Sequence, residues 1–203
     1  MIRAVGDEHF GTGFTLDVDA RQYLITAKHV VASLSSEGAI EIHKLGDHWD
    51  LINIKIFRCD DPIDIAILVP PSQLTPALRL EPSSASFFFG QDVYFVGFPY
   101  GLSMNVARDV NYGFPIAFMK KGIISAAAAV NGGRIIFLDG HNNPGFSGGP
   151  IVHRDLNQSD VVFKLLGVVS GFRPETTPVL KPEKIEPSAV TSPKFLLSMD
   201  ASN

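Results

Sequence analysis

Short apolar or alternating segments, broken by glycine, proline, aspartate and asparagine, recur along most of the 203-residue chain. Such segments are typical of β-strands, whereas amphipathic helices repeat apolar residues every three or four positions. The pattern therefore predicts an all-β protein with one short helical turn within residues 27–34. The expected strands are residues 10–18, 21–27, 39–44, 50–58, 63–69, 92–97, 115–127, 134–139, 149–153 and 161–170.

Residues 70–86 are rich in proline and serine and separate these strands into two sets. This composition predicts a surface connector between two β halves. Asn131-Gly132 lies between two expected strands, and this dipeptide favours a tight hairpin turn because both positions tolerate positive φ. After residue 172, repeated prolines exclude long regular elements. We expect a first β domain in residues 1–80, a second in residues 87–172 and a proline-rich tail in residues 173–203.

The charge balance argues against a nucleic-acid partner. The chain has 17 Lys+Arg against 21 Asp+Glu, a formal net charge of −4, and it contains no Lys/Arg run. A protein that binds the phosphate backbone normally presents clustered basic residues. A polypeptide of this length, with 45% hydrophobic residues, buries an ample core without a disulfide or a metal. The composition predicts an ordinary globular protein.

The sequence lacks several motifs that mark particular cellular locations and cofactors. Cys59 is the single cysteine and forms no internal disulfide, which fits a reducing compartment. The first residues have no basic-then-apolar signal segment, and no stretch approaches the roughly 18 apolar residues of a membrane helix. We therefore expect a cytoplasmic protein with no membrane partner. Without a H-E-x-x-H, a paired C-x-x-C or a P-loop, we expect neither a metal nor a nucleotide cofactor.

The segment most suggestive of chemistry surrounds Ser147, within Gly145-Phe146-Ser147-Gly148-Gly149-Pro150. Glycines allow a sharp bend that exposes the serine oxygen and turns backbone N–H groups into one concavity. An acyl-transfer nucleophile and its oxyanion hole need this arrangement. Taken alone, the segment reads equally well as a glycine-rich strand connection.

A serine hydroxyl needs a histidine base that is oriented by a carboxylate. His29 stands at the exit of an apolar strand, and Asp64 opens the apolar run Asp64-Ile65-Ala66-Ile67-Leu68. Each residue by itself is more often a cap or a turn residue. The order His29, Asp64, Ser147 excludes the α/β-hydrolases, in which the acid and then the histidine follow the serine.

Taken together, these segments resemble the chymotrypsin-like (trypsin-fold) serine peptidases, especially the bacterial high-temperature-requirement branch. The resemblance runs from about Phe10 to Phe172. It implies two six-stranded antiparallel Greek-key barrels with the active site in the cleft between them. The matching motifs are Gly11-Thr12-Gly13-Phe14, Thr26-Ala27-Lys28-His29, Asp64-Ile65-Ala66-Ile67-Leu68, Val96-Gly97-Phe98-Pro99, Gly122-Ile123-Ile124-Ser125, Gly145-Phe146-Ser147-Gly148-Gly149-Pro150 and Leu166-Gly167-Val168-Val169-Ser170-Gly171.

The resemblance also implies roles for individual residues. Ser147 is the expected nucleophile, His29 the base and Asp64 the acid that orients it, with the N–H groups of Gly145 and Ser147 as the oxyanion hole. His141 matches the base of the specificity pocket, where enzymes that select Arg or Lys carry an acid. The expected substrate is a polypeptide. The expected substrate-binding residues are His141, Asn142, Pro144, Ser170, Gly171 and Phe172.

Phe146 departs from the family pattern. Members that are activated by N-terminal cleavage carry an acid at this position, so we do not expect such activation here. Phe146 also allows a second interpretation, in which the oxyanion loop is collapsed until a ligand or partner binds. Two alternatives to a constitutive peptidase therefore remain: a protease-fold peptide-binding module, and a peptidase regulated by a ligand, a partner or a further domain.

Overall fold

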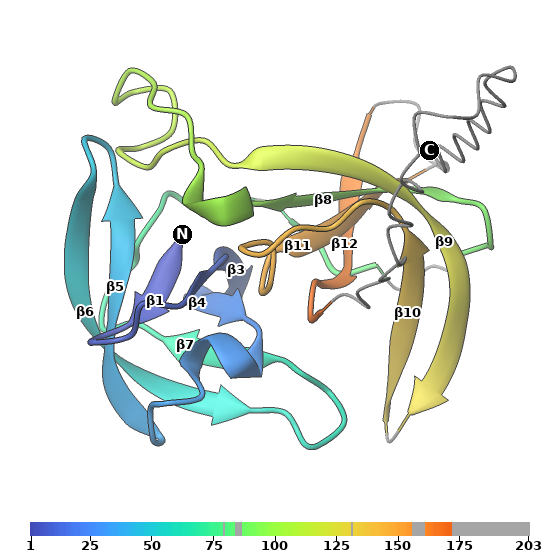
Figure 1. Ribbon diagram of the computed structural model, residues 1–203, viewed down its shortest axis with the longest axis horizontal. Helices are drawn as coiled ribbons and strands as arrows, with labels where there is room; N and C mark the ends of the chain where they lie inside the picture. Colours follow the sequence, from blue (N-terminus) through green and yellow to red (C-terminus); the bar gives the residue numbers. More distant parts are fainter. Residues whose placement is uncertain (79, 84–86, 131, 156–160, 172–203) are drawn as a thin grey trace, which may run out of the picture. The chain divides into compact units, whose positions relative to one another are not determined.

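Two curled antiparallel β-sheets contain nearly all of the regular structure (Figure 1). The computed structural model describes residues 1–78, 80–83, 87–130, 132–155 and 161–171. Residues Met1–Phe172 form one compact unit. The all-β prediction with two trypsin-like β halves is confirmed, but the described strands divide into seven and five rather than six and six. Among these residues, no helix is long and apolar enough to cross a membrane.

The first sheet is built from the N-terminal strands in the order β2-β1-β5-β6-β7-β4-β3. Its core depends on strict alternation: in β6, Ile54 and Ile56 are buried while Lys55 between them is exposed. Ile40 of β5 and Leu68 of β7 pack into the same cluster. The strands are β1 (Ile2–Ala4), β2 (Phe10–Gly11), β3 (Phe14–Val18), β4 (Arg21–Thr26), β5 (Glu37–Lys44), β6 (His48–Arg58) and β7 (Ala66–Val69).

The second sheet has the order β10-β9-β8-β11-β12. Its core cluster includes Val93 and Phe95 of β8, Ile124 of β9 and, from outside the strands, Phe146. A phenylalanine next to Ser147 thus belongs to the core of this sheet. The strands are β8 (Asp92–Gly97), β9 (Phe118–Val130), β10 (Gly133–Asp139), β11 (Pro150–Arg154) and β12 (Phe163–Val168).

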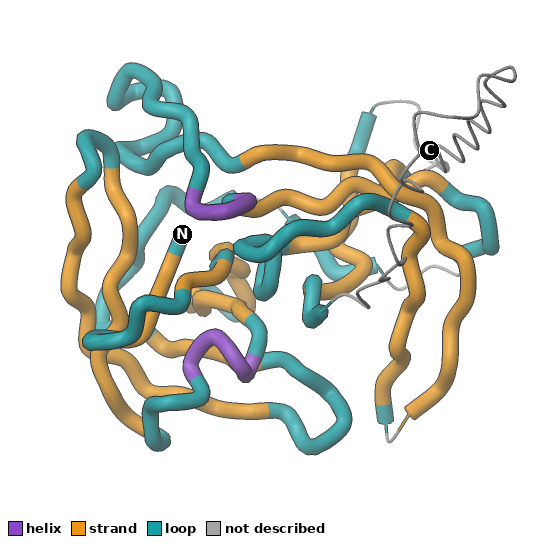
Figure 2. Tube along the Cα trace, in the orientation of Figure 1, coloured by secondary structure: helices purple, strands orange, loops and turns teal. Residues whose placement is uncertain are grey.

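The expected strand over residues 10–18 is divided into β2 and β3. The division falls at Thr12, whose N–H donates to the carbonyl of Ser147, 2.7 Å away, instead of to a neighbouring strand. The expected helical turn is present as the 3-10 helix η1 (Lys28–Val31), and a second turn, η2 (Pro99–Gly101), was not expected (Figure 2). The first sheet also contains β1, whose three residues are too few to show an alternating pattern.

The hairpin predicted at Asn131-Gly132 joins β9 and β10, which pair from Val130 and Gly133 onward. Gly132 has a φ of +78°, as a tight hairpin turn requires. Asn131 lies outside the described residues.

Candidate active site

His29 and Asp64 are in direct contact. His29 lies in η1, immediately after β4, and Asp64 lies just before β7. His29 Nδ1 is 2.7 Å from Asp64 Oδ2, and the His29 backbone N–H donates to Asp64 Oδ1 at 3.2 Å. The bond to Asp64 raises the pKa of His29 above its ordinary value of 6.5, although partial burial opposes the shift. The imidazole keeps about half of its surface in solvent, since the side chain is 50% exposed.

Lys28 connects the segment that carries Asp64 to the turn that carries His29. Its ammonium donates to Cys59 O at 3.1 Å and pairs with Asp61 Oδ1 at 2.5 Å. The Lys28 backbone N–H donates to Asp64 O at 3.4 Å. The bond from Lys28 lowers the pKa of the exposed Asp61 carboxyl. Three contacts from one residue thus hold the acid segment beside η1.

The loop that contains Ser147 lies against the end of β4, close to where η1 begins. Besides the Thr12 N–H bond to Ser147 O, Thr12 Oγ1 donates to Gly145 O at 2.7 Å. Gly148 fits tightly here, because an added Cβ would overlap Thr12 O and Thr26 Oγ1, and Thr26 is the last residue of β4. The structure therefore brings the Ser147 loop to the turn that carries His29. The Ser147 hydroxyl makes no hydrogen bond to any described residue, His29 included.

The backbone N–H groups of Gly145 and Ser147 have no acceptor among the described residues. The carbonyl of Pro144 accepts from the Tyr100 N–H at 2.8 Å. In a trans peptide the C=O and the following N–H point in opposite directions, so the Gly145 N–H is turned away from Tyr100. Gly145 has a φ of +102°, and a Cβ there would overlap Phe98 O, so only glycine suits the position. Two free donors flank Phe146.

Phe146 anchors this loop in the core of the second sheet. Its side chain is fully buried and meets the Phe95 ring edge-on, with 5.3 Å between ring centroids. Gly97 leaves the space for it, because a Cβ at Gly97 would lie 2.6 Å from Phe146 Cδ1. The position that is acidic in cleavage-activated relatives is therefore an apolar anchor here.

The predicted substrate-binding residues fall into two segments. His141 and Pro144 are exposed and Asn142 is half-buried, just before the Ser147 loop. Val169 follows β12 and exchanges backbone bonds with the loop, since Gly148 N–H donates to Val169 O at 2.7 Å and Val169 N–H donates to Gly149 O at 2.8 Å. The exposed Ser170 and Gly171 continue from it. Phe172, predicted with them, lies outside the described residues.

Three residues in this region were missed by the sequence analysis: Tyr100, Lys120 and Asn143. Lys120 of β9 donates to His141 O at 3.1 Å and also hydrogen-bonds Asn143 Oδ1. Asn143 Nδ2 donates to Tyr100 Oη at 3.0 Å. Burial lowers the pKa of the Lys120 ammonium. The one sequence feature that could have indicated Lys120 is a lysine at an inward-facing position of the alternating strand β9.

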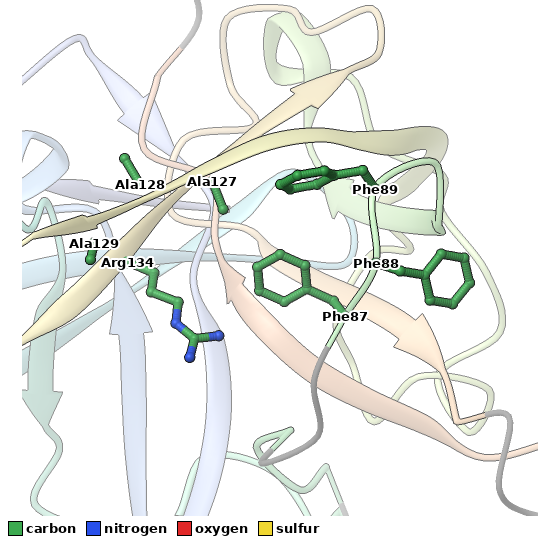
Figure 3. Close-up of a pocket in the computed structure, with 7 residues that line it drawn as sticks. All are labelled: Phe87, Phe88, Phe89, Ala127, Ala128, Ala129 and Arg134. Carbon is green, nitrogen blue, oxygen red and sulfur yellow. The ribbon is translucent and has the colours of Figure 1, made fainter.

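A separate hollow lies on the second sheet (Figure 3). Its lining includes none of the predicted site residues, so it is distinct from the region around Ser147. In the part of the chain that the structure describes, no group of three or more His, Cys, Asp or Glu side chains is placed to hold a metal ion. The lining residues of the hollow are Phe87, Phe88, Phe89, Ala127, Ala128, Ala129 and Arg134.

Comparison with known proteins agrees with this geometry. Residues 11–159 match the family model described as "Trypsin-like peptidase domain". "Protease Do-like 1, chloroplastic" from Arabidopsis thaliana is 28% identical over 145 residues, which are 70% of this chain and 30% of that protein. This chain thus matches less than a third of the length of that relative.

Solved structures share the fold. The inactive form of the Rv3671c protease, from M. tuberculosis H37Rv, superposes with a TM-score of 0.55 and 25% identity, over 84% of this chain and 75% of that one. Deg5 superposes with a TM-score of 0.52 over 75% of this chain and 72% of its own, and at 23% identity this likeness concerns the fold alone. Because the family model covers most of the chain, the protein belongs to the trypsin-like peptidase domain family.

Proposed function

We propose that this domain hydrolyses peptide bonds with Ser147 as nucleophile, His29 as general base and Asp64 as the orienting acid. The observation that carries the proposal is the 2.7 Å contact between His29 Nδ1 and Asp64 Oδ2, next to the loop that bears Ser147. A carboxylate on Nδ1 keeps that nitrogen protonated and leaves Nε2 as the basic nitrogen, the one that must face a serine.

In the proposed reaction, Ser147 Oγ attacks the carbonyl carbon of the scissile bond while its proton passes to His29 Nε2. The tetrahedral intermediate collapses when His29 returns that proton to the leaving amine, which gives an acyl-enzyme on Ser147. Water then repeats both steps and releases the acid. Asp64 stabilises the imidazolium that forms in each step.

The free N–H groups of Gly145 and Ser147 support an oxyanion hole. They are the only backbone donors of residues 145–149 for which the structure gives no acceptor. Donors fixed in advance toward the developing charge stabilise the transition state, and loss of one typically costs about 3–4 kcal/mol. A collapsed loop is not favoured, because the Pro144 carbonyl is already bonded to the Tyr100 N–H.

A polypeptide substrate is expected to lie along Ser170 and Gly171 as an added strand, with its P1 side chain toward residues 141–144. Both residues are exposed and extend from Val169, which is bonded to the Ser147 loop. The absence of a hydrogen bond between Ser147 and His29 does not oppose catalysis, because such bonds often form only when substrate is bound.

A fluorophosphonate probe tests the proposal, because it labels only an activated serine. We expect labelling of the wild-type protein at Ser147, none in Ser147→Ala, and strongly slowed labelling in His29→Ala. Labelling that requires an added peptide would select the ligand-regulated alternative. Absence of labelling, together with retained peptide binding, would select the binding module and overturn the peptidase.

A further inference from the structure

The ammonium of Lys120, on β9, contacts the loop that precedes Ser147 at several points. Lys120 Nζ donates to His141 O at 3.1 Å and to Asn143 Oδ1, and it lies 5.2 Å from the centroid of the Phe146 ring. The ammonium therefore contacts the loop at its start, in its middle and at the residue beside the nucleophile. Such charge-assisted bonds are stronger than bonds between neutral groups.

No carboxylate pairs with Lys120 among the described residues. Burial is the cause of its lowered pKa, and no acidic neighbour offsets that shift. The loop offers carbonyl oxygens and an aromatic ring instead, since Phe146 supplies no charge. Lys120 is partly buried, and the carbonyl, amide and aromatic groups that its ammonium contacts all belong to this loop.

Asn143 links Lys120 to Tyr100 by two side-chain hydrogen bonds. Its Oδ1 accepts from Lys120, while its Nδ2 donates to Tyr100 Oη at 3.0 Å and lies 3.2 Å from His141 Nε2. The Tyr100 N–H in turn holds the Pro144 carbonyl, the group whose direction sets that of the Gly145 N–H. A continuous set of bonds therefore joins Lys120 to the proposed oxyanion donor.

We infer that Lys120 is a positioning residue, whose ammonium holds residues 141–147 in the shape that keeps the Gly145 and Ser147 N–H groups aimed at the oxyanion. The inference rests on the proposed peptidase function. It adds that a residue of the chain itself, a lysine of β9, holds the loop in its active shape.

Lys121 provides a matched control. It is the next residue on β9, so its side chain points to the opposite face, where its Nζ pairs with Asp92 Oδ2 at 2.8 Å. Lys121→Met removes the same charge and the same number of atoms as Lys120→Met, without touching the loop.

The test compares wild type, Lys120→Met and Lys121→Met in peptide hydrolysis. We expect Lys120→Met to lower kcat about tenfold or more, with a smaller effect on KM, because an oxyanion contact acts mainly in the transition state. Lys121→Met should match wild type. Equal kcat values in all three proteins, or a loss confined to KM, would overturn the inference.

A second readout is independent of activity. Amide hydrogen exchange in peptides that span residues 141–149 should be faster in Lys120→Met and unchanged in Lys121→Met. Unchanged exchange in Lys120→Met overturns the inference whether or not the protein is a peptidase, whereas absence of fluorophosphonate labelling in wild type overturns the proposed function alone.

The coupling through Asn143 is tested with Asn143→Ala and the double variant. If Lys120 acts through Asn143, the double variant loses little more kcat than Lys120→Met alone. Fully additive losses would show that the two residues act separately and would contradict the proposed path.

Discussion

Ser147 and His29 are expected to act as one unit. We predict that Ser147→Ala and His29→Ala each lower kcat about 10⁴-fold or more, and that the double variant loses little beyond either one. The reason is that the base has no function without the nucleophile, and the hydroxyl is a weak nucleophile without its base. Steady-state hydrolysis of a peptide substrate by the three variants measures this. Multiplying losses would contradict a shared proton-transfer step.

The Asp64 contact sets the pH at which His29 becomes a base. Because this hydrogen bond raises the pKa of His29 above 6.5, protonated imidazole persists to a higher pH than in a free histidine. Only neutral imidazole accepts the serine proton, so kcat/KM should fall as pH drops through a midpoint above 6.5.

An NMR titration of the His29 ring measures this midpoint directly. The midpoint should lie above 6.5 in Ser147→Ala, which keeps the Asp64 contact, and should move to lower pH when Asp64→Asn is added. A midpoint that Asp64→Asn leaves unchanged would show that another group controls the titration of His29.

The residues that could be predicted from the sequence are those in short local motifs. His29, Asp64 and Ser147 each stand in a distinctive stretch, and the predicted pairing of His29 with Asp64 appears in the structure. Lys120 and Tyr100 were missed because their roles depend on distant partners. Lys120 reaches the loop because of the register of β9, and Tyr100 does so because its backbone is left-handed, with a φ of 53°.

At the scale of secondary structure, alternation located most strands, since β8 occupies the predicted residues 92–97 and η1 lies inside the predicted turn. It failed where a tertiary contact decides the backbone. The expected strand over residues 10–18 is broken because the Thr12 N–H donates to Ser147 O and not to a neighbouring strand. No periodicity within that segment encodes a partner more than a hundred residues away.

Thr12 is therefore expected to stabilise the connection between the two sheets. It is buried, its Oγ1 donates to Gly145 O at 2.7 Å, and it accepts from the Phe98 N–H at 3.3 Å. Thr12→Val keeps the shape but leaves both backbone groups without a partner. We expect the free energy of unfolding to fall by about 1–3 kcal/mol.

Urea unfolding of Thr12→Val and Thr15→Val makes the comparison. Thr15 Oγ1 shares a 3.0 Å bond with Thr75 Oγ1 in a partly exposed setting, where water replaces the lost partner. The Thr15→Val loss should be clearly smaller. Equal losses would contradict a special role for the buried bonds of Thr12.

The segments around the proposed P1 pocket predict its preference. The pocket is expected between residues 141–144 and the strand that begins at Ser170, with His141 at its base. Asp139 ends β10 and is exposed, and the Lys120 ammonium lies 3.1 Å from the His141 carbonyl oxygen. A buried cationic side chain without a partner costs several kcal/mol, so Arg and Lys should be disfavoured at P1.

We expect cleavage after small or medium uncharged residues such as Ala, Val or Thr, with Glu as the alternative if a protonated His141 points inward. Profiling the products from a mixture of denatured proteins measures the preference. A dominant Arg or Lys preference would contradict the pocket assignment. A Glu preference that disappears in His141→Ala would select the alternative.

Across the whole molecule, the candidate site draws on both sheets. His29 and Asp64 belong to the first and the Ser147 loop to the second, and the bonds of Thr12 join the two. Both core clusters lie within Met1–Phe172, the compact unit of the fold. Peptidase activity is therefore expected to depend on this unit and not on the proline-rich residues that follow.

Removing residues 176–203 should leave the thermal unfolding midpoint within a few degrees of the full chain and kcat/KM within about twofold, because neither core cluster nor any proposed catalytic residue is lost. A shorter variant that ends at residue 160 is the control. It removes β12, which pairs with β11 from Pro150 to Arg154, and it also removes Val169, which bonds to the Ser147 loop. We expect that variant to lose both folding and activity. Calorimetry and peptide hydrolysis on the two truncations decide the matter: loss of activity in the longer one would mean that residues after 175 complete the site.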